Sequence, residues 1–232
     1  MFKAIIFDLD GTLIDSAQDV RHALNKLLIA HKCQEIEYDH IYGYLKHGIC
    51  WLIKTAFLQS KKKLDDNVID ELIKEYLFNY QAEPIARTTI YPGVIETLSL
   101  LKKQEIKFGI CTNKPSIMTN IVLEKLQLIS FFDAVVAADD TAHLKPHPAH
   151  IYDTLIKLDI KSGSDVVMVG DSDNDIIAAK NARIPVIAAK YGYSVAAITR
   201  LEPDLSIDDF YSLPSALKNI YHSIYEKQIH NE

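Results

Sequence analysis

Short apolar runs recur along the chain and end in polar, acidic or glycine residues. They are too brief for helices and rich in Val, Ile and Phe, so they predict buried parallel strands. The runs are Ala4–Phe7, Lys107–Cys111, Ala134–Ala138, Val166–Val169 and Val186–Ala189. Stretches with helical spacing lie between them, at Val94–Lys103, Ile117–Leu126, Ala149–Leu158 and Asn174–Asn181. This alternation predicts an α/β fold, a Rossmann-like doubly wound parallel sheet with helices on both faces.

The alternation is interrupted between Ser16 and about Ile85, where helical spacing recurs without a comparable strand. Apolar side chains follow this spacing at Val20, Leu24, Leu27 and Leu28, and again at Ile69, Leu72, Tyr76 and Tyr80. Ser16 followed by Asp19 resembles a capping box at the start of the first helix. We therefore expect residues 1–15 and 86–232 to form the α/β core and residues 16–85 to form a helical insertion after the first strand.

Charge and composition exclude several classes of partner. The net charge is −6 and the longest basic run is Lys61–Lys63, so we expect no nucleic-acid partner, which would need a clustered basic face. The first apolar run, Ala4–Phe7, is too short for a signal or membrane segment. The cysteines Cys33, Cys50 and Cys111 are widely spaced, which argues against a disulfide framework or structural zinc and suits a cytoplasmic protein.

Polar clusters follow the predicted strands. In sheets of this kind, ligands bind beyond the carboxyl ends of the strands, so these clusters would converge at one edge. The clusters are Asp8-Leu9-Asp10-Gly11-Thr12, Thr112-Asn113-Lys114-Pro115, Leu144-Lys145-Pro146-His147-Pro148 and Gly170-Asp171-Ser172-Asp173-Asn174-Asp175.

The chemistry of these clusters points to a cation and a phosphate. Three carboxylates brought together, those of Asp8, Asp10 and Asp171, would repel one another without a cation. Oxygen ligands with no His or Cys among them suit Mg²⁺. The hydroxyl, amide and ammonium groups of Thr112, Asn113 and Lys145 could donate to phosphate oxygens.

An aspartate beside such donors can attack phosphorus and form an acyl phosphate. The four clusters, in this order and separation, resemble the four motifs of the haloacid dehalogenase-like phosphatases. The resemblance covers nearly the whole chain and is greatest to the phosphoglycolate phosphatase-like group. Tyr191-Gly192-Tyr193 and Pro203-Asp204 also stand where that group has the same residues.

The resemblance implies a role for each matching residue. Asp8 would be the nucleophile, and Asp10 would first protonate the leaving oxygen and then activate water. Thr112 and Asn113 would hold the phosphoryl group, while Lys145 would balance the negative charge.

The resemblance also implies a metal site. Mg²⁺ would bind Asp8, the backbone carbonyl of Asp10, and Asp171, and Asp175 would orient the metal's surroundings through water or Lys145. Gly11 would provide backbone freedom in a tight turn of the substrate-binding site.

Relatives use an insertion at this position as a mobile helical cap that contacts the non-phosphate end of the substrate. They usually have a Gly-x-Gly stretch there, whereas this chain has Lys46-His47-Gly48. We place Lys46 and His47 among the candidate substrate-binding residues. Lys46 either pairs with a substrate carboxylate, such as that of 2-phosphoglycolate, or points outward.

We therefore expect a Mg²⁺-dependent phosphatase, monomeric or homodimeric, that converts a small phosphomonoester, with 2-phosphoglycolate the best candidate, through a phospho-aspartyl intermediate on Asp8. A phosphatase for a sugar phosphate or nucleotide, a phosphomutase and a phosphometabolite-binding module without turnover remain alternatives. A dehalogenase would lack Asp10, a receiver domain would be shorter, and a nicotinamide-binding domain would need a glycine-rich turn after the first strand.

Overall fold

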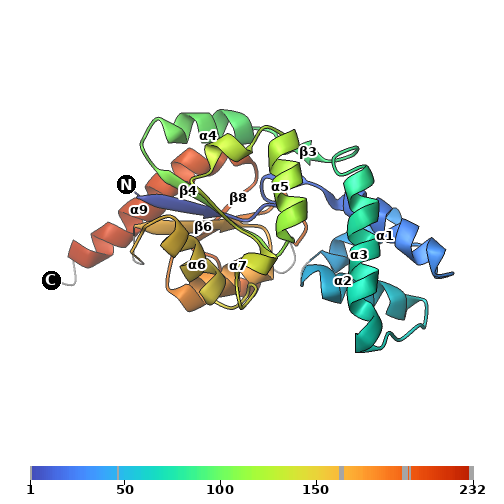
Figure 1. Cartoon of the computed structure of the whole chain (residues 1–232). Helices are drawn as coiled ribbons and strands as arrows, with labels where there is room; N and C mark the ends of the chain where they lie inside the picture. Colours follow the sequence, from blue (N-terminus) through green and yellow to red (C-terminus); the bar gives the residue numbers. More distant parts are fainter. Residues whose placement is uncertain (1, 46, 162–164, 195–197, 199, 230–232) are drawn as a thin grey trace.

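A parallel sheet forms the centre of the computed structural model, which describes residues 2–229 except 46, 162–164, 195–197 and 199 (Figure 1). Over this described part, six strands pair in the order β5-β4-β1-β6-β7-β8, and every neighbouring pair is parallel. The strands are β1 (Ala4–Phe7), β4 (Lys107–Cys111), β5 (Ala134–Val136), β6 (Val166–Gly170), β7 (Val186–Ala189) and β8 (Leu205–Ile207). The predicted α/β class is confirmed.

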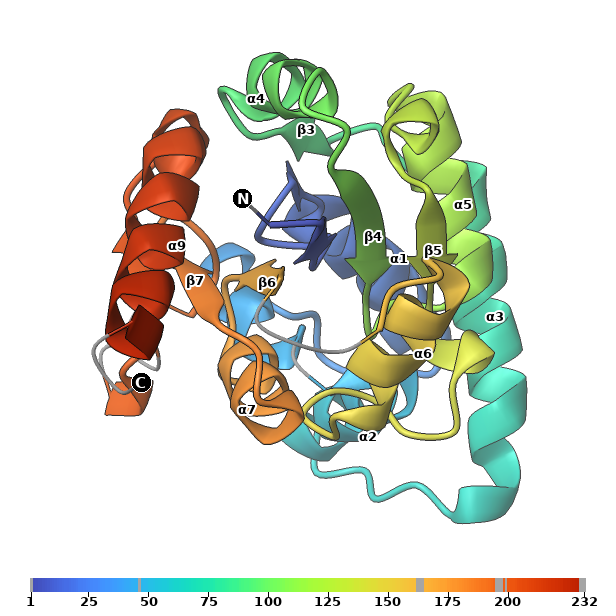
Figure 2. The ribbon, with the colours of Figure 1, turned by 90° about the vertical axis from the view of Figure 1, so that its left-hand side faces the viewer.

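Helices cover both faces of the sheet, because alternate side chains of each buried strand point to opposite sides. In β1, Ile5 and Phe7 pack in one apolar cluster while Ala4 and Ile6 pack in the other. The first cluster includes α4 (Val94–Lys102), α5 (Ser116–Lys125) and α9 (Leu213–Ile229). The second includes α6 (Ala149–Lys157) and α7 (Asp173–Ala182), and Figure 2 shows the two helical layers.

The order of the strands brings the predicted clusters together. The chain proceeds from β1 to β4 and β5 on one side and then returns to β6 on the other side of β1. Phe7, the last residue of β1, is in register with Ile110 of β4 and Val169 of β6. The residues that follow these three strands therefore meet at a topological switch point, where α/β sheets bind ligands.

A helical segment, residues 17–82, follows β1 in the chain. It comprises α1 (Ala17–Ala30), the 3₁₀ turns η1 (Tyr38–Tyr44) and η2 (Asp66–Val68), α2 (Gly48–Gln59) and α3 (Ile69–Ala82). Two short antiparallel strands, β2 (Ile14–Asp15) and β3 (Thr89–Ile90), join its two ends. Figure 1 shows the segment beside the carboxyl ends of the central strands. All eight apolar side chains that marked its helices in the sequence are buried.

Two details of the helical segment differ from expectation. Ser16 does stand before α1, but its side chain does not cap the helix; it donates to Asp10 instead. The Asp19 carboxylate accepts hydrogen bonds from the backbone N–H of Arg87 and the hydroxyl of Thr88. The predicted capping box was therefore wrong, because both side chains hydrogen-bond to groups outside α1.

Candidate active site

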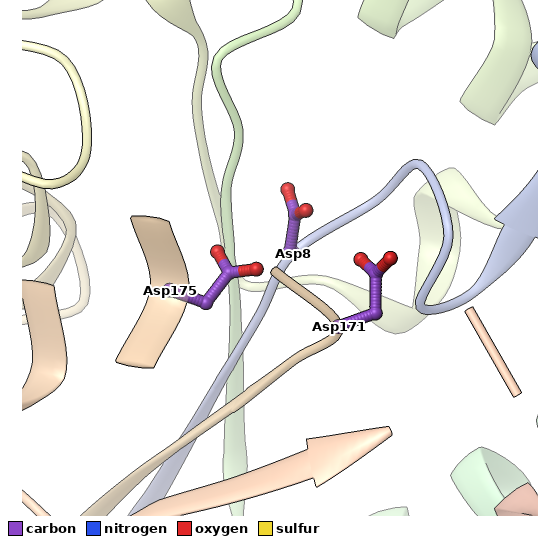
Figure 3. A group of neighbouring side chains, drawn as sticks. All are labelled: Asp8, Asp171 and Asp175. Carbon is purple, nitrogen blue, oxygen red and sulfur yellow. The ribbon is translucent and has the colours of Figure 1, made fainter. Parts of the chain in front are cut away.

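Three buried carboxylates lie together at the switch point (Figure 3). Asp8 follows β1, Asp171 follows β6, and Asp175 lies in the first turn of α7. One oxygen from each of the three carboxylates can be chosen so that all lie within 4.8 Å of one another. The sequence brought these residues to one place because two of them directly follow paired parallel strands.

Backbone and hydroxyl donors fix Asp171. The hydroxyl of Thr12 donates to one of its carboxylate oxygens at 3.2 Å, and the backbone N–H of Tyr193 donates to the other at 2.7 Å. Gly11 has φ +89°, and a Cβ added there would lie 2.3 Å from Asp171 Oδ2. Only glycine therefore fits between the turn after β1 and this carboxylate.

Lys145 links the other two carboxylates. Its ammonium Nζ lies 2.9 Å from Asp8 Oδ1 and 2.6 Å from Asp175 Oδ1. Burial alone would lower the pKa of Lys145, but the carboxylates of Asp175 and Asp8 more than offset this and raise its pKa. The Asn113 side chain holds the loop of Lys145, accepting from its backbone N–H at 3.0 Å and donating to its carbonyl at 2.9 Å.

The acidic cluster has the properties of a cation site. Burial raises the pKa of Asp8 to about 7, and the charge of Asp175 adds to the rise while Lys145 opposes it. Burial, followed by the charges of Asp8 and Asp175, likewise raises the pKa of Asp171. A divalent cation would relieve this repulsion, and carboxylate oxygens alone suit a hard ion. The residues present therefore fit a metal ion.

Asp175 contributes to this site in a different way from Asp8 and Asp171. Its Oδ1 contacts Lys145, and its Oδ2 accepts from both the backbone N–H and the hydroxyl of Ser172, at 3.0 and 2.6 Å. Ser172 and Asp175 form a capping box at the start of α7. Because one of its oxygens is paired with the Lys145 ammonium and the other accepts two hydrogen bonds from Ser172, Asp175 is better placed to orient Lys145 than to bind a cation directly.

Asp10 stands apart from the three clustered carboxylates. Its two oxygens lie 3.0 and 3.1 Å from Nζ of Lys114, and the hydroxyl of Ser16 also donates to it. Lys114 is 6% exposed, so this is a nearly buried ion pair. The geometry holds the Asp10 carboxyl group in one position at the junction between the sheet and the helical segment.

A pocket opens between the sheet edge and the helical segment. Asp8, Asp10, Thr112, Lys145 and Asp171 form part of its polar floor. The helical segment contributes mainly apolar and aromatic side chains, among them Tyr42, Tyr44, Leu45, Ile49, Leu52 and Tyr76.

The two candidates from the helical segment differ from these residues. His47 is exposed, and its ring packs edge-on against Trp51 with ring centroids 4.8 Å apart. The pocket lining, as far as the chain is described, does not include His47. Lys46 lies outside the described residues.

Sequence reasoning missed three residues of the site. Lys114 belongs to the motif Thr112-Asn113-Lys114-Pro115, but the sequence did not predict a role for it. Its contact with Asp10 depends on the path of the loop after β4. Tyr193 donates its backbone N–H to Asp171, and its hydroxyl donates to Asp15 at 3.0 Å. Tyr76 was predicted only to be a core residue of its helix. Its helical spacing placed it on the buried face of α3, and part of that face lines the pocket.

Comparisons with known proteins agree with this geometry. Residues 5–189 match the haloacid dehalogenase-like hydrolase family. The phosphoglycolate phosphatase of Agrobacterium fabrum is 40% identical over 215 residues, which cover 91% of each chain. That of Rhodospirillum rubrum is 35% identical over 217 residues, covering 92% of this chain and 90% of the relative.

A solved structure gives the same result. The crystal structure of a predicted phosphoglycolate phosphatase from Haemophilus somnus has a TM-score of 0.85 and 29% identity, over 93% of this chain and 98% of that one. This chain belongs to the haloacid dehalogenase-like hydrolase family, as its motifs predicted. Over the residues described, no helix combines the length and the apolar character needed to cross a membrane.

Proposed function

We propose that this chain is a Mg²⁺-dependent phosphatase that hydrolyses 2-phosphoglycolate to glycolate and phosphate through a phospho-aspartyl intermediate on Asp8. One observation carries the proposal: Asp8 lies beside a buried ammonium, that of Lys145, and beside Asp171 at a site suited to a cation. The names of the relatives from Agrobacterium fabrum and Rhodospirillum rubrum support the choice of substrate.

Asp8 is the proposed nucleophile. An oxygen of its carboxylate attacks phosphorus, the bond from phosphorus to the ester oxygen breaks, and Asp10 gives the leaving oxygen a proton. Asp10 then takes a proton from water, the hydroxide attacks the phosphoryl group, and phosphate leaves with Asp8 regenerated. Lys145 holds Asp8 in place and balances charge, while the Thr112 hydroxyl donates to a phosphoryl oxygen.

Asn113 has a changed role in this proposal. Its side chain hydrogen-bonds to the backbone of Lys145, so it positions the lysine rather than offering that amide to the substrate. Mg²⁺ would be held by Asp8, Asp171 and the backbone carbonyl of Asp10, with Asp175 acting through Lys145. When bound, the ion neutralises charge on the transferring phosphoryl group, which is a large share of catalysis in this class of reaction.

Residues 16–85 are the proposed cap over this chemistry. The cap would exclude water from the phospho-aspartate until the leaving group has gone. Its apolar and aromatic lining favours a small leaving group, because the several hydroxyls of a sugar would be buried without enough partners. This observation favours 2-phosphoglycolate over hexose phosphates and nucleotides.

Phosphate release from purified protein tests the proposal. The substrates are 2-phosphoglycolate, a hexose 6-phosphate and a nucleoside monophosphate, each with Mg²⁺ and with a chelator. We expect fastest release from 2-phosphoglycolate, loss of release with chelator, and a fall of about 1,000-fold or more in Asp8→Asn. Asp39→Asn, at an exposed site, is the matched control and keeps the rate.

Other outcomes identify the alternatives. A preference for a sugar phosphate or nucleotide would overturn the substrate and keep the chemistry. Isomerisation of a sugar phosphate without phosphate release would favour a mutase. Tight binding of a phosphoester with no turnover would favour a binding module.

A further inference from the structure

We propose that Lys114 and the hydroxyl of Tyr76 form the subsite that takes the carboxylate of the substrate, beside the acid–base residue Asp10. This inference rests on the proposed function and adds to it the residues that select the substrate. Both side chains line the pocket. They come from different parts of the fold, Lys114 from the loop after β4 and Tyr76 from α3.

Lys114 is the cation suited to this task. Among the described residues, two lysines line the pocket, and the ammonium of Lys145 is held between Asp8 and Asp175 at 2.9 and 2.6 Å. Lys114 instead pairs with a single carboxylate, that of Asp10, at 3.0 Å. An ammonium has three N–H donors, so Lys114, paired with one carboxylate rather than two, is the lysine that can also bind an anion at the leaving-group end of the pocket.

The position of Lys114 suits the chemistry of 2-phosphoglycolate. In that compound a single carbon atom separates the ester oxygen from the carboxyl group. Asp10 is the residue proposed to protonate the ester oxygen, so a group that binds the carboxylate must lie directly beside Asp10. Nζ of Lys114 lies 3.0 Å from Asp10 Oδ1, which places its charge at that position.

Tyr76 provides the second contact. Its side chain is 1% exposed, and its hydroxyl has no hydrogen-bond partner among the described residues. Tyr76 lines the same pocket as Asp10 and Lys114. A buried hydroxyl without a partner is costly, and a substrate carboxylate accepting its O–H would satisfy it.

The neighbouring tyrosine completes the wall. Tyr80 lies one helical turn further along α3, its ring stacked on that of Tyr76 with centroids 6.4 Å apart. Nζ of Lys114 lies 5.3 Å from the centroid of the Tyr80 ring. Lys114 is nearly buried, and a charge in a low-dielectric site interacts strongly with an incoming anion, so this wall favours a charged leaving group over a neutral one of the same size.

The test compares two substrates that differ in this one group. They are 2-phosphoglycolate and ethylene glycol monophosphate, in which a hydroxymethyl group replaces the carboxylate. In Lys114→Met we expect kcat/KM to fall for both esters, but roughly 100-fold further for 2-phosphoglycolate. In Tyr76→Phe, which removes one hydroxyl, we expect a selective fall of roughly tenfold for 2-phosphoglycolate.

Lys125→Met and Tyr152→Phe are the matched controls, because Lys125 is exposed on α5 and Tyr152 is 39% exposed on α6. Both should keep the preference of the wild type. If Lys114→Met does not fold, as judged by circular dichroism, the Tyr76→Phe result decides.

The outcomes separate this inference from the proposed function. An equal loss for both esters in Lys114→Met and in Tyr76→Phe would overturn the subsite, because residues that merely position Asp10 or support the fold would affect both substrates alike. The proposed function would then stand as long as the wild type prefers 2-phosphoglycolate. A wild type with no preference between the two esters would overturn both.

Discussion

The carboxylate of Asp171 packs directly against Gly11, so the turn after β1 leaves no room for a side chain at position 11. A Cβ at Gly11 would lie 2.3 Å from Asp171 Oδ2, at a φ of +89° that side chains rarely adopt. We expect Gly11→Ala to displace Asp171, to raise the Mg²⁺ concentration needed for half-maximal activity, and to lower kcat/KM by about 100-fold. A Mg²⁺ titration of phosphate release measures both effects.

Gly43→Ala is the control for this prediction. A Cβ at Gly43 would meet no atom within 4 Å, and its φ lies outside the left-handed region. The control should keep the Mg²⁺ requirement of the wild type. An unchanged Mg²⁺ requirement in Gly11→Ala would contradict the account of this turn.

Sequence reasoning at the residue scale worked where a side chain directly follows a buried strand. Asp8 and Asp171 could be placed together because parallel strands carry the next residue to a common edge. The contacts of Lys114 with Asp10 and of Asn113 with the Lys145 backbone could not be foreseen. They depend on the paths of two loops that approach each other only in the folded chain.

Among the elements, the junction between α1 and the strand β3 carries a specific prediction. The buried carboxylate of Asp19 accepts from the backbone N–H of Arg87 at 2.9 and 3.1 Å and from the hydroxyl of Thr88 at 2.7 Å. In Asp19→Asn an amide –NH₂ would face one of these donors. We expect the variant to lose about 2–4 kcal/mol of stability, measured by urea unfolding.

The same variant should open the junction locally. Trypsin cleaves after arginine, and Arg87 lies in the loop that Asp19 holds. Limited proteolysis followed by mass spectrometry should show faster cleavage after Arg87 in Asp19→Asn than in Asp66→Asn, whose side chain is 90% exposed. Equal cleavage in the two variants would show that Asp19 does not hold the junction.

Fully buried or clearly periodic patterns predicted elements better than weak ones did. The run Ala4–Phe7 matches β1, and Val94–Lys103 differs from α4 by one residue. β8 was missed because it has only three residues, one of them buried. The prediction of a capping box before α1 was wrong because Ser and Asp side chains also hydrogen-bond well to groups outside their helix, and the sequence alone does not rank these choices.

For the whole molecule, the acidic cluster predicts how stability depends on pH. Folding raises the pKa of Asp8 from 3.8 to about 7 and also raises that of Asp171. The folded, metal-free chain therefore holds protons that the unfolded chain releases above about pH 4. Its free energy of unfolding should fall as pH rises through about 7. Mg²⁺ should restore stability, and more so at pH 8 than at pH 5.5.

His150 changes the free energy of unfolding with pH in the opposite direction, so its contribution has to be separated from that of the acidic cluster. Burial, with a further contribution from the charge of Lys145, lowers the pKa of His150 from 6.5 to about 4. The unfolded chain therefore binds a proton at His150 more readily than the folded chain does, and this lowers the free energy of unfolding as pH falls from about 6.5 towards 4. Urea unfolding of wild type and Asp8→Asn in chelator, from pH 5.5 to 8.5, isolates the cluster. The fall with rising pH should be smaller in the variant, and an identical pH profile in both proteins would contradict the account.

At this scale the sequence indicated the fold and the chemistry through four motifs spaced along one α/β pattern. The sequence of the helical segment said less about where that segment lies relative to the site. Its position over the site follows from the β2–β3 pair, two residues in each strand, a signal too short to recognise. The spacing of Tyr76 predicted that its side chain is buried, but its place in the pocket follows from how α3 packs.

Trapping the intermediate tests the central claim most directly. Asp10→Asn cannot activate water, so it should retain the phospho-aspartate formed from an ester whose leaving group needs no proton. Rapid quenching of this variant after mixing with Mg²⁺ and 4-nitrophenyl phosphate, whose phenolate leaves unprotonated, followed by peptide mass spectrometry, should locate one phosphoryl group on Asp8. The Asp8→Asn variant should carry none. A phosphoryl group on another residue, or labelling that persists in Asp8→Asn, would contradict the account.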